Sequence, residues 1–466
     1  MARAKKEAVL TPEERLQAAL VPDWEWPYKL PENWCWTRLG SVSTIVGGGT
    51  PSSGVAEYYE NGTIPWISPA DLSGYSDMYI SHGAKNITEL GLEKSSARLM
   101  PAGTVCLSSR APIGYVVIAQ NDISTNQGFK SMLPSPCFIS EYLYWYLKGN
   151  KELLESYASG TTFLEISGGK TAQVEFPLAP LAEQQRIVDR IESLFAKLDE
   201  AKEKAQAVVD SFETRKAAIL HKAFTGKLTA KWREERGVGM ESWEKRRINE
   251  LARPRAGYAF DSKKFSNTGY QVVRMGNLYG ETLDLFRKPV FISEDDVDDS
   301  ILNRALIKDG DILITLTGTK YKRDYGYAVC VSSPNKLLVN QRILCLTPFA
   351  CVERNYLLYY LKSNLFRDVF FSCETGGVNQ GNVSSKFVEN IEIPIPTFDE
   401  QLEITTVLDR TLAHEQQAKE AAEAVLAQID LMKKSILARA FRGELGTNDP
   451  AEESAVELLK RVLREE

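Results

Sequence analysis

The stretch LAEQQRIVDRIESLF…AAILHKAFTGKL at residues 181–228 returns as FDEQLEITTVLDRTL…KKSILARAFRGEL at residues 398–445. In both copies the same number of positions separates a glutamine from a glycine: Gln184 from Gly226, then Gln401 from Gly443. Similar ends and a constant length indicate a duplicated rigid element, and an internal repeat decides the architecture of a chain. The sequence therefore predicts a protein built from two similar halves.

Apolar residues inside the two stretches recur at steps that alternate between four and three, which is typical of a coiled-coil seam. The small alanines near the middle would let two helices approach closely, and the polar Thr411 and Glu415 interrupt the second seam. The predicted seam consists of Ile187, Ile191, Leu194, Leu198, Ala201, Ala205, Phe212, Ile404, Leu408, Ala418, Ala422, Ile429 and Ile436.

Each seam implies a long helix, since about 40 residues at ~1.5 Å each give roughly 60 Å. Two copies most simply pair about a pseudo-twofold axis, so the helices would be antiparallel with one domain at each end. A coiled coil that serves only as a spacer or dimerisation element is the simpler interpretation of the seam alone. The repeated Pro-rich start and Ala-Phe-x-Gly end of each stretch argue against it.

A segment of strands and turns precedes each long helix, and the two segments repeat one order. Residues 101–105 correspond to 308–312, Asn126-Gln127 to Asn340-Gln341, and 142–148 to 356–362. We therefore predict a mixed α/β (α+β) fold. Two globular domains are separated by two long antiparallel coiled-coil helices in a pseudo-twofold internal repeat.

The domain boundaries follow from the repeat and from the turn residues that interrupt it. A Thr11-Pro12-Glu13-Glu14 capping box opens a short N-terminal helix. The predicted order is an N-terminal helix and extended segment (1–33), a first domain (34–180), a first long helix (181–226), a linker (227–242), a second domain (243–398), a second long helix (399–443) and a C-terminal tail with a short helix (444–466).

The composition is that of an ordinary water-soluble protein, with 466 residues, 43% hydrophobic and 25% charged. There is no apolar run of about 18 residues and no secretory signal, so we expect a cytoplasmic protein without a membrane partner. The 7 cysteines are scattered and form no C-x-x-C, which indicates reduced, mostly buried thiols. The net charge of −6 neither supports nor excludes DNA, because residues 243–398 carry a slight basic excess.

Sequence signals for catalysis are missing. The 3 histidines lie far apart and outside any zinc spacing. Ser167-Gly168-Gly169-Lys170-Thr171 resembles the end of a phosphate-binding loop, but the pattern needs a glycine where Leu164 stands, so a turn is the better interpretation. Neither an Asn/Asp-Pro-Pro-Tyr clamp nor a G-x-S-x-G elbow occurs. We expect no catalytic residue, metal site or cofactor in this chain.

The repeated segments resemble the specificity subunits of Type I restriction–modification enzymes. The resemblance is carried by PLAPLAEQQRIV (177–188), AFTGKLTAKWREE (223–235), SILARAFRGEL (435–445) and the domain opening LPENWCWTRLG (30–40). It covers nearly the whole chain, twice. Together these motifs are specific, although each alone is weak.

The resemblance implies that each domain is a target-recognition domain for one half of a split double-stranded DNA target. The helices would set the unspecified spacer and bind two DNA-adenine methyltransferase subunits, which use S-adenosylmethionine. Two restriction–translocase subunits that use ATP and Mg²⁺ would join for restriction, and this chain would bind no cofactor. Half-sites on one face of DNA lie about 34–36 Å apart per turn, so two domains with radii near ~15 Å need a rod between them.

The repeat also sorts residues by role. Residues common to both domains, such as Asn126-Gln127, Asn340-Gln341 and the tyrosines of 142–146 and 356–360, are predicted scaffold. Residues that differ at matched positions are candidates for reading DNA, because Arg and Lys bind guanine O6/N7 or phosphate and hydroxyls adapt to either. An ordinary solvated loop remains the alternative. The candidates are Ser108, Ser109, Arg110, Thr317, Thr319, Lys320, Tyr321, Lys322 and Arg323, with Gly48, Thr50, Ser52, Lys263, Lys264 and Arg274 as a second set.

Two other functions stay open at this point. A fused methyltransferase–specificity protein would transfer methyl groups by itself, and the missing cofactor motifs argue against it. A structural or chaperone-like coiled-coil protein would ignore DNA, and the divergent loops of the paired domains argue against that.

Overall fold

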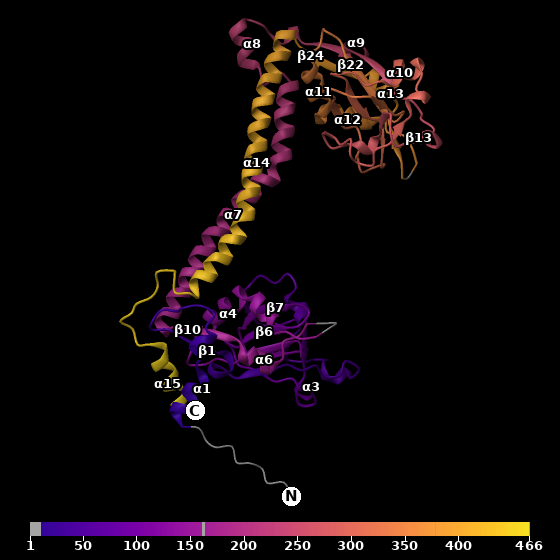
Figure 1. Ribbon diagram of the computed structural model, residues 1–466. Coiled ribbons are helices and arrows are strands. Elements are labelled where there is room, and N and C mark those ends of the chain that lie inside the picture. Colours follow the sequence, from indigo (N-terminus) through magenta and orange to yellow (C-terminus); the bar gives the residue numbers. More distant parts are fainter. Residues whose placement is uncertain (1–10, 161–163, 378, 466) are drawn as a thin grey trace. The chain divides into compact units, whose positions relative to one another are not determined.

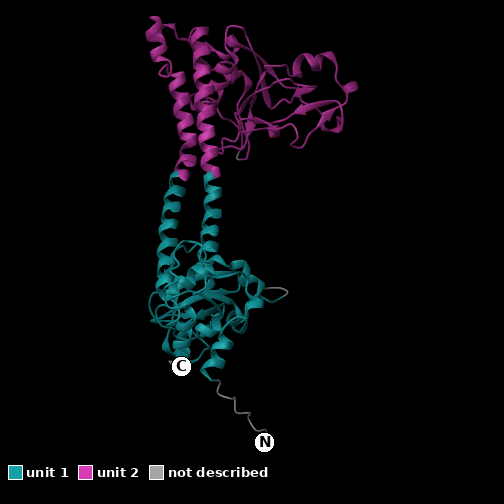
Figure 2. Ribbon diagram, turned by 60° about the vertical axis from the view of Figure 1, so that its left-hand side comes forward, with its two compact units in different colours: residues 1–204, 425–466 teal, residues 205–424 magenta. Residues whose placement is uncertain are grey.

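The computed structural model describes residues 11–160, 164–377 and 379–465. The chain forms two compact units (Figure 2), of which unit 1 contains Met1–Lys204 with Val425–Glu466 and unit 2 contains Ala205–Ala424. Each unit combines one globular domain with parts of both long helices, α7 (Leu181–Phe224) and α14 (Phe398–Ala440). The mixed helix-and-sheet fold with two domains and two long helices is as predicted.

The two long helices end in the same way. Gly226 and Gly443 follow the last turns with φ of 74° and 73°, a left-handed conformation that favours glycine. The following amide closes each end, since Lys227 N–H donates to Lys222 O and Glu444 N–H donates to Arg439 O, both at 2.9 Å. The glycine of the repeat is therefore the helix stop.

The helices pack against each other in antiparallel order within each unit. In unit 1 the Lys433 ammonium pairs with Asp199 and lies 4.9 Å from the ring centroid of Phe195. In unit 2 Arg215 pairs with Glu415 at 2.6 Å. The acid that interrupts the predicted seam therefore has a cationic partner on the facing helix.

Most residues of the predicted seam are shielded from solvent, and some of them, such as Ile187 and Ile404, belong to the hydrophobic cores of the domains. Ile187, Ile191, Ala205, Phe212, Ile404, Leu408, Ala422 and Ile429 are buried, and Leu194, Leu198, Ala201 and Ile436 are half-buried. Ala418 is exposed instead. The adjacent Lys419 packs there in its place, with its ammonium 4.8 Å from the ring centroid of Phe212, because a long aliphatic stem can cover apolar surface while its charge stays wet.

The domain of unit 1 is built on a five-stranded sheet of order β2-β9-β6-β7-β4 and a three-stranded sheet of order β5-β3-β8, and β1 pairs with β10. Helix α4 (Ser140–Gly149) packs on β6 and β7. Figure 1 labels β1, β10, β6 and β7 of this domain together with helix α4. The strands are β1 (Cys35–Arg38), β2 (Ile45–Gly47), β3 (Ile64–Ile67), β4 (Tyr79–Ile80), β5 (Lys85–Ile87), β6 (Val105–Ser109), β7 (Ile113–Ala119), β8 (Ser124–Thr125), β9 (Phe129–Met132) and β10 (Glu175–Leu178). The remaining short helices are α2 (Leu39–Val42), α3 (Glu89–Glu93), α5 (Lys151–Ser156) and α6 (Gly168–Gln173).

The domain of unit 2 contains sheets of order β12-β22-β18-β20 and β13-β17-β14-β21 and the pairs β11-β24, β15-β16 and β19-β23. The strands are β11 (Glu244–Arg247), β12 (Ala252–Ala256), β13 (Phe265–Ser266), β14 (Tyr270–Val273), β15 (Leu278–Tyr279), β16 (Thr282–Leu283), β17 (Phe291–Ile292), β18 (Ile312–Thr315), β19 (Thr317–Gly318), β20 (Ala328–Cys330), β21 (Leu337–Val339), β22 (Ile343–Pro348), β23 (Gly381–Asn382) and β24 (Glu392–Ile395). Its helices include α9 (Ile248–Leu251), α10 (Asp299–Ala305), α11 (Arg354–Lys362), α12 (Asn364–Ser372) and α13 (Ser385–Glu389).

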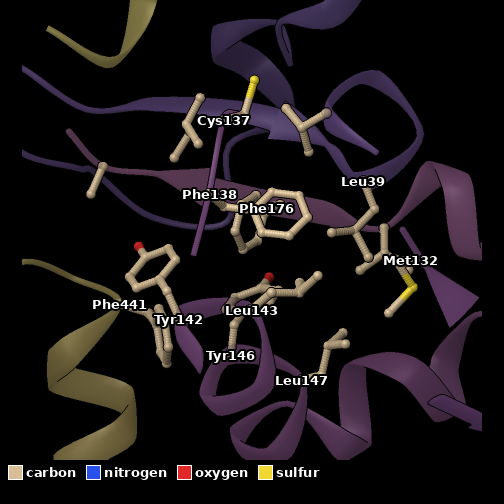
Figure 3. Packing of buried hydrophobic residues seen from close by; sticks show 14 of the residues in the cluster. Leu39, Met132, Cys137, Phe138, Tyr142, Leu143, Tyr146, Leu147, Phe176 and Phe441 are labelled. Atoms are coloured by element: carbon tan, nitrogen blue, oxygen red, sulfur yellow. The ribbon is translucent and has the colours of Figure 1, made fainter. Parts of the chain in front are cut away.

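Each domain core receives a phenylalanine from the end of a long helix. In unit 1 the Phe441 ring packs against Tyr142 and Tyr146 of α4, with 5.1 Å between ring centroids in both pairs (Figure 3). In unit 2 Phe224 packs in the same way against Tyr356 and Tyr360 of α11, at 5.3 and 5.1 Å. The domain that precedes α7 is thus closed by the end of α14, and the domain that precedes α14 by the end of α7.

Short helices flank this arrangement. In unit 1, α15 (Ala455–Glu465) packs on α1 (Pro12–Ala19), which begins at the predicted capping box of Thr11 and Glu14. In unit 2, the segment predicted as a linker contains the helix α8 (Ala230–Arg236). In the part of the chain that the structure describes, no helix combines the length and the apolar character that crossing a membrane requires.

Candidate nucleic-acid interface

A shared turn follows a parallel strand pair in each domain. β3 runs parallel to β8, and Asn126 follows β8 directly; β14 runs parallel to β21, and Asn340 follows β21. The side chain of Asn126 accepts the Gly128 N–H at 2.8 Å, and that of Asn340 accepts the Arg342 N–H at 3.3 Å. We name these three-residue turns the Asn turns. The ends of parallel strands are frequent ligand sites in sheet proteins.

A glycine lies against each Asn turn. A Cβ atom on Gly48 would stand 1.9 Å from Asn126 O, and one on Gly257 would stand 2.1 Å from Asn340 O. Both distances are far inside van der Waals contact, so both positions require glycine. Gly48, a predicted DNA contact, thus has a scaffold role that explains its identity without DNA, and the matched Gly257 shows that the role is common to both domains.

The loops with the strongest DNA candidates begin beside the Asn turns. Ser109 N–H donates to Gly128 O at 2.7 Å, and Leu316 N–H donates to Arg342 O at 2.9 Å. In domain 1 (34–180) the structure therefore brings two separate groups of predicted residues together around one turn. In domain 2 (243–398) it places the start of the predicted loop at the matched turn.

The domain 1 candidates differ in accessibility. Ser108 and Ser109 are buried, and their hydroxyls donate to Pro112 O and Gly128 O. Arg110 is half-buried and lies 3.6 Å from Glu165. Thr50 and Ser52 are exposed.

Two further polar side chains of domain 1 lie at the same turn. The hydroxyl of Thr50 donates to the side chain of the exposed Gln127. The Lys130 ammonium lies 3.4 Å from Glu165 and 3.3 Å from Ser109 Oγ. Sequence reasoning gave Gln127 a scaffold role and passed over Lys130, which carries no motif.

The domain 2 loop presents a mixture of anchored and open side chains. Thr317 is buried and donates to Asn382 at 3.0 Å, the backbone N–H of Thr319 donates to Asp324 at 2.7 Å, and Lys320 donates to Gly376 O at 2.9 Å. Tyr321 is 78% exposed. Lys322 is exposed and, among the residues described, has no carboxylate partner.

Arg323 and Tyr325 anchor the far end of this loop to α12 and to Glu374, which lies after it. The Arg323 guanidinium lies 3.7 Å from Asp368 and 5.2 Å from the centroid of the Phe371 ring. The Tyr325 hydroxyl donates to Glu374 at 2.7 Å, and burial together with this carboxylate raises the pKa of Tyr325. The Tyr325 hydroxyl therefore holds the base of the loop in place through this hydrogen bond.

The second set of domain 2 candidates is spread out. Lys263 is exposed, and Lys264 pairs with Asp296 at 2.9 Å. Arg274 directly follows β14 and donates to Lys288 O at 2.8 Å. Of the second set in this domain, only Arg274 is therefore positioned by the parallel strand pair that carries the Asn turn.

The residues around the Asn turns offer polar and charged side chains. Within residues 11–160, 164–377 and 379–465, no group of three or more His, Cys, Asp and Glu side chains could hold a metal ion. The hydroxyls, amides, guanidiniums and ammoniums around these turns are groups that bind DNA bases and phosphates, and the half-buried carboxylate of Glu165 and the exposed one of Asp368 lie beside them. The arrangement suits recognition.

Comparison with known proteins identifies the family. The model of the Type I restriction modification DNA specificity domain matches the chain twice, at residues 31–209 and 240–424. These two matches cover most of the chain, one for each domain with the adjoining part of its long helix. The chain belongs to the family of Type I restriction–modification specificity subunits.

Individual relatives agree with this assignment. The specificity subunit of the Type I restriction enzyme MjaIX of Methanocaldococcus jannaschii is 30% identical over 79% of this chain and 84% of its own length. The EcoKI specificity subunit of Escherichia coli K12 is 25% identical over 94% and 96%. Among solved structures, the HsdS subunit of Thermoanaerobacter tengcongensis has a TM-score of 0.65 at 20% identity, covering 90% of this chain and 100% of that one, which shows a common fold.

Proposed function

We propose that this chain is the non-catalytic DNA-specificity subunit of a Type I restriction–modification enzyme, in which each domain reads one half of a bipartite double-stranded target. One observation carries the proposal. The two domains share the Asn turn, the glycine behind it and the loop that starts beside it, and they differ in the side chains around this frame. A common frame with divergent surroundings is what reading two different half-sites requires.

The long helices supply the second part of the proposal. Antiparallel packing of α7 and α14 supports a rod that sets the spacer between the half-sites. Exposed apolar side chains on α14, namely Leu402, Val425, Leu431 and Met432, suit the binding of two DNA-adenine methyltransferase subunits. S-adenosylmethionine would be bound by those subunits, and ATP with Mg²⁺ by two restriction–translocase subunits, in the cytoplasm.

Co-expression with the methyltransferase subunits of its system and methylome sequencing of the host test the proposal. We expect methylated adenines in two specified half-sites that are separated by a fixed number of unspecified bases. A continuous motif, or no sequence-specific methylation, would contradict it. Methyl transfer by the isolated chain would instead favour the fused-enzyme alternative.

A further inference from the structure

A basic pocket lies at the Asn turn of domain 2. The cavity of about 420 Å³ is lined by Arg274, Asn277, Arg287, Lys288, Asn340 and Arg342, together with Met275 and Gly276. Four of its lining residues are cationic and none is acidic. The pocket forms where the parallel strands β14 and β21 end, because Arg274 and Asn340 are the residues that follow them.

The cations of this basic pocket lack counter-charges. In the part of the chain that the structure describes, no carboxylate forms an ion pair with any of the four. Other basic residues of the domain do have such partners, as Lys264 has Asp296 and Lys336 has Glu294. Four like charges around one cavity repel one another and attract a ligand rich in hydrogen-bond acceptors.

The basic pocket is also held in shape before any ligand arrives. Arg274 donates to Lys288 O at 2.8 Å, and the buried Asn277 donates to Arg287 O and Asp284 O, both at 2.9 Å. The Arg287 guanidinium lies 5.7 Å from the centroid of the Tyr279 ring. These contacts fix the segment from 284 to 288 against the end of β14, and preorganised donors lose less entropy on binding.

The same place in domain 1 has a different character. Ser68 and Gly128 stand where domain 2 has Arg274 and Arg342, and Asp71 stands where it has Asn277. The backbone frame is nevertheless alike, since Asp71 accepts the Ser68 N–H at 2.7 Å and Asn277 accepts the Arg274 N–H at 2.9 Å. The two domains therefore keep one frame, and domain 2 carries arginines where domain 1 has a serine and a glycine.

From these observations we infer that the basic pocket reads guanine in the half-site of domain 2, with Arg274 and Arg342 as the specificity-determining residues. The inference rests on the proposed function and deepens it. A guanidinium matches O6 and N7 of guanine with two parallel hydrogen bonds in the major groove. Arg342 is exposed on the Asn turn, while the anchored Arg274 is aligned by its bond to Lys288.

The test compares methylomes of hosts that carry the complete methyltransferase complex with the wild-type chain, Arg342→Gln, Arg342→Lys or Arg274→Gln. The wild type first establishes the two half-sites; failure to find a bipartite motif would overturn the proposed function itself. With the motif in hand, each variant should lose discrimination by about 10- to 100-fold at one or two G·C pairs of one half-site. The other half-site should stay unchanged.

The lysine variant separates base reading from charge alone. Arg342→Lys keeps the cation and loses the planar fork, so relaxed specificity is expected for it as well. Lys336→Gln, which removes a paired lysine of the same domain, is the matched control and should leave the motif intact. Two results would overturn the inference. The first is methylation that Arg342→Gln weakens equally on all sequences, with a smaller salt dependence, and that Arg342→Lys restores, because this would show a phosphate contact. The second is an unchanged motif in all three arginine variants.

Discussion

The two helix starts use the same Glu-Gln pair with different neighbours. Gln184 accepts the Ile139 N–H at 3.0 Å and Gln401 accepts the Glu353 N–H at 2.8 Å, and the adjacent carboxylates of Glu183 and Glu400 accept an indole N–H from Trp34 and Trp243. These hydrogen bonds are common to both units. They show why Glu-Gln recurs in the repeat: it ties the start of each long helix to the domain before it.

The remaining donors to the two carboxylates differ. Glu400 is paired with the buried Arg233, which follows α7 in the chain. Glu183 receives only neutral donors from the segment after α14, Asn448 at 2.8 Å and Thr447 at 3.3 Å, in the part of the chain that the structure describes. In both units a glutamate at the helix start is the acceptor, and its remaining donors come from the segment that follows the other long helix. Only in unit 2, among the residues described, is one of those donors charged.

The largest effects are expected where the two units are alike. Phe441→Ala and Phe224→Ala each remove a buried ring that packs against two tyrosines. Each substitution should lower the free energy of unfolding by about 3–5 kcal/mol. Hydrogen exchange measured by mass spectrometry should show faster exchange in α4 for the first variant and in α11 for the second. A large effect in only one unit would break the equivalence of the two cores.

The helix starts should respond unequally. Arg233→Met leaves the buried Glu400 carboxylate without its cation and should cost about 3–5 kcal/mol. Asn448→Ala removes one neutral donor from Glu183 and should cost about 1–3 kcal/mol. Urea denaturation measures the loss of unfolding free energy in each variant, and hydrogen exchange in β11 and in β1 locates it. Equal losses in the two variants would contradict the claim that Glu400 depends on a cationic partner and Glu183 does not.

The glycines behind the Asn turns should act on one half-site each. Gly48→Ala and Gly257→Ala force a Cβ against the carbonyl of Asn126 or Asn340, so the turn must move. We expect at least tenfold slower methylation in each case together with a lower thermal stability, because the added Cβ meets backbone atoms that have to shift. Restored activity on DNA altered in a single half-site would sharpen the assignment, and wild-type methylation by both variants would refute it.

The smallest expected effect concerns an acid that only domain 2 has. Glu281 pairs with Lys216 of α7 and lies 3.1 Å from Lys362, and domain 1 has Tyr75 at the matched position. Burial raises the pKa of Glu281, but the hydrogen bond to Lys216 and the charges of Lys362 and Lys216 outweigh it and leave that pKa below its usual 4.5.

A depressed pKa means that the ion pairs stabilise the fold above the pKa of the unfolded chain and are lost as pH falls through the lower folded value. The wild type should therefore lose slightly more thermal stability than Glu281→Gln when pH falls from 7 to below about 4. The effect stays small because the carboxylate is 40% exposed. Identical pH dependence of both proteins would show that the pairs contribute nothing.

The sequence predicted the large features well and the local ones less well, for physical reasons. Helix repeats, capping residues and the helix-ending glycines act over a few neighbouring positions, so they can be read from the chain. Whether Ser108 faces solvent depends on Pro112 and Tyr115 across a strand turn, which no spacing reveals. The sorting rule for matched positions could have found Arg342, because domain 1 has Gly128 at the matched position.

An exchange of domains tests the central claim most directly. A chain that carries the 243–398 domain in both positions keeps the matched contacts of both helix starts and both helix ends. With its methyltransferase partners, its methylome should show the half-site of domain 2 at both ends of the target, in inverted orientation, with the wild-type gap. If the half-site of domain 1 persisted, or if the motif became continuous, the account of one frame that holds two independent reading domains would be contradicted.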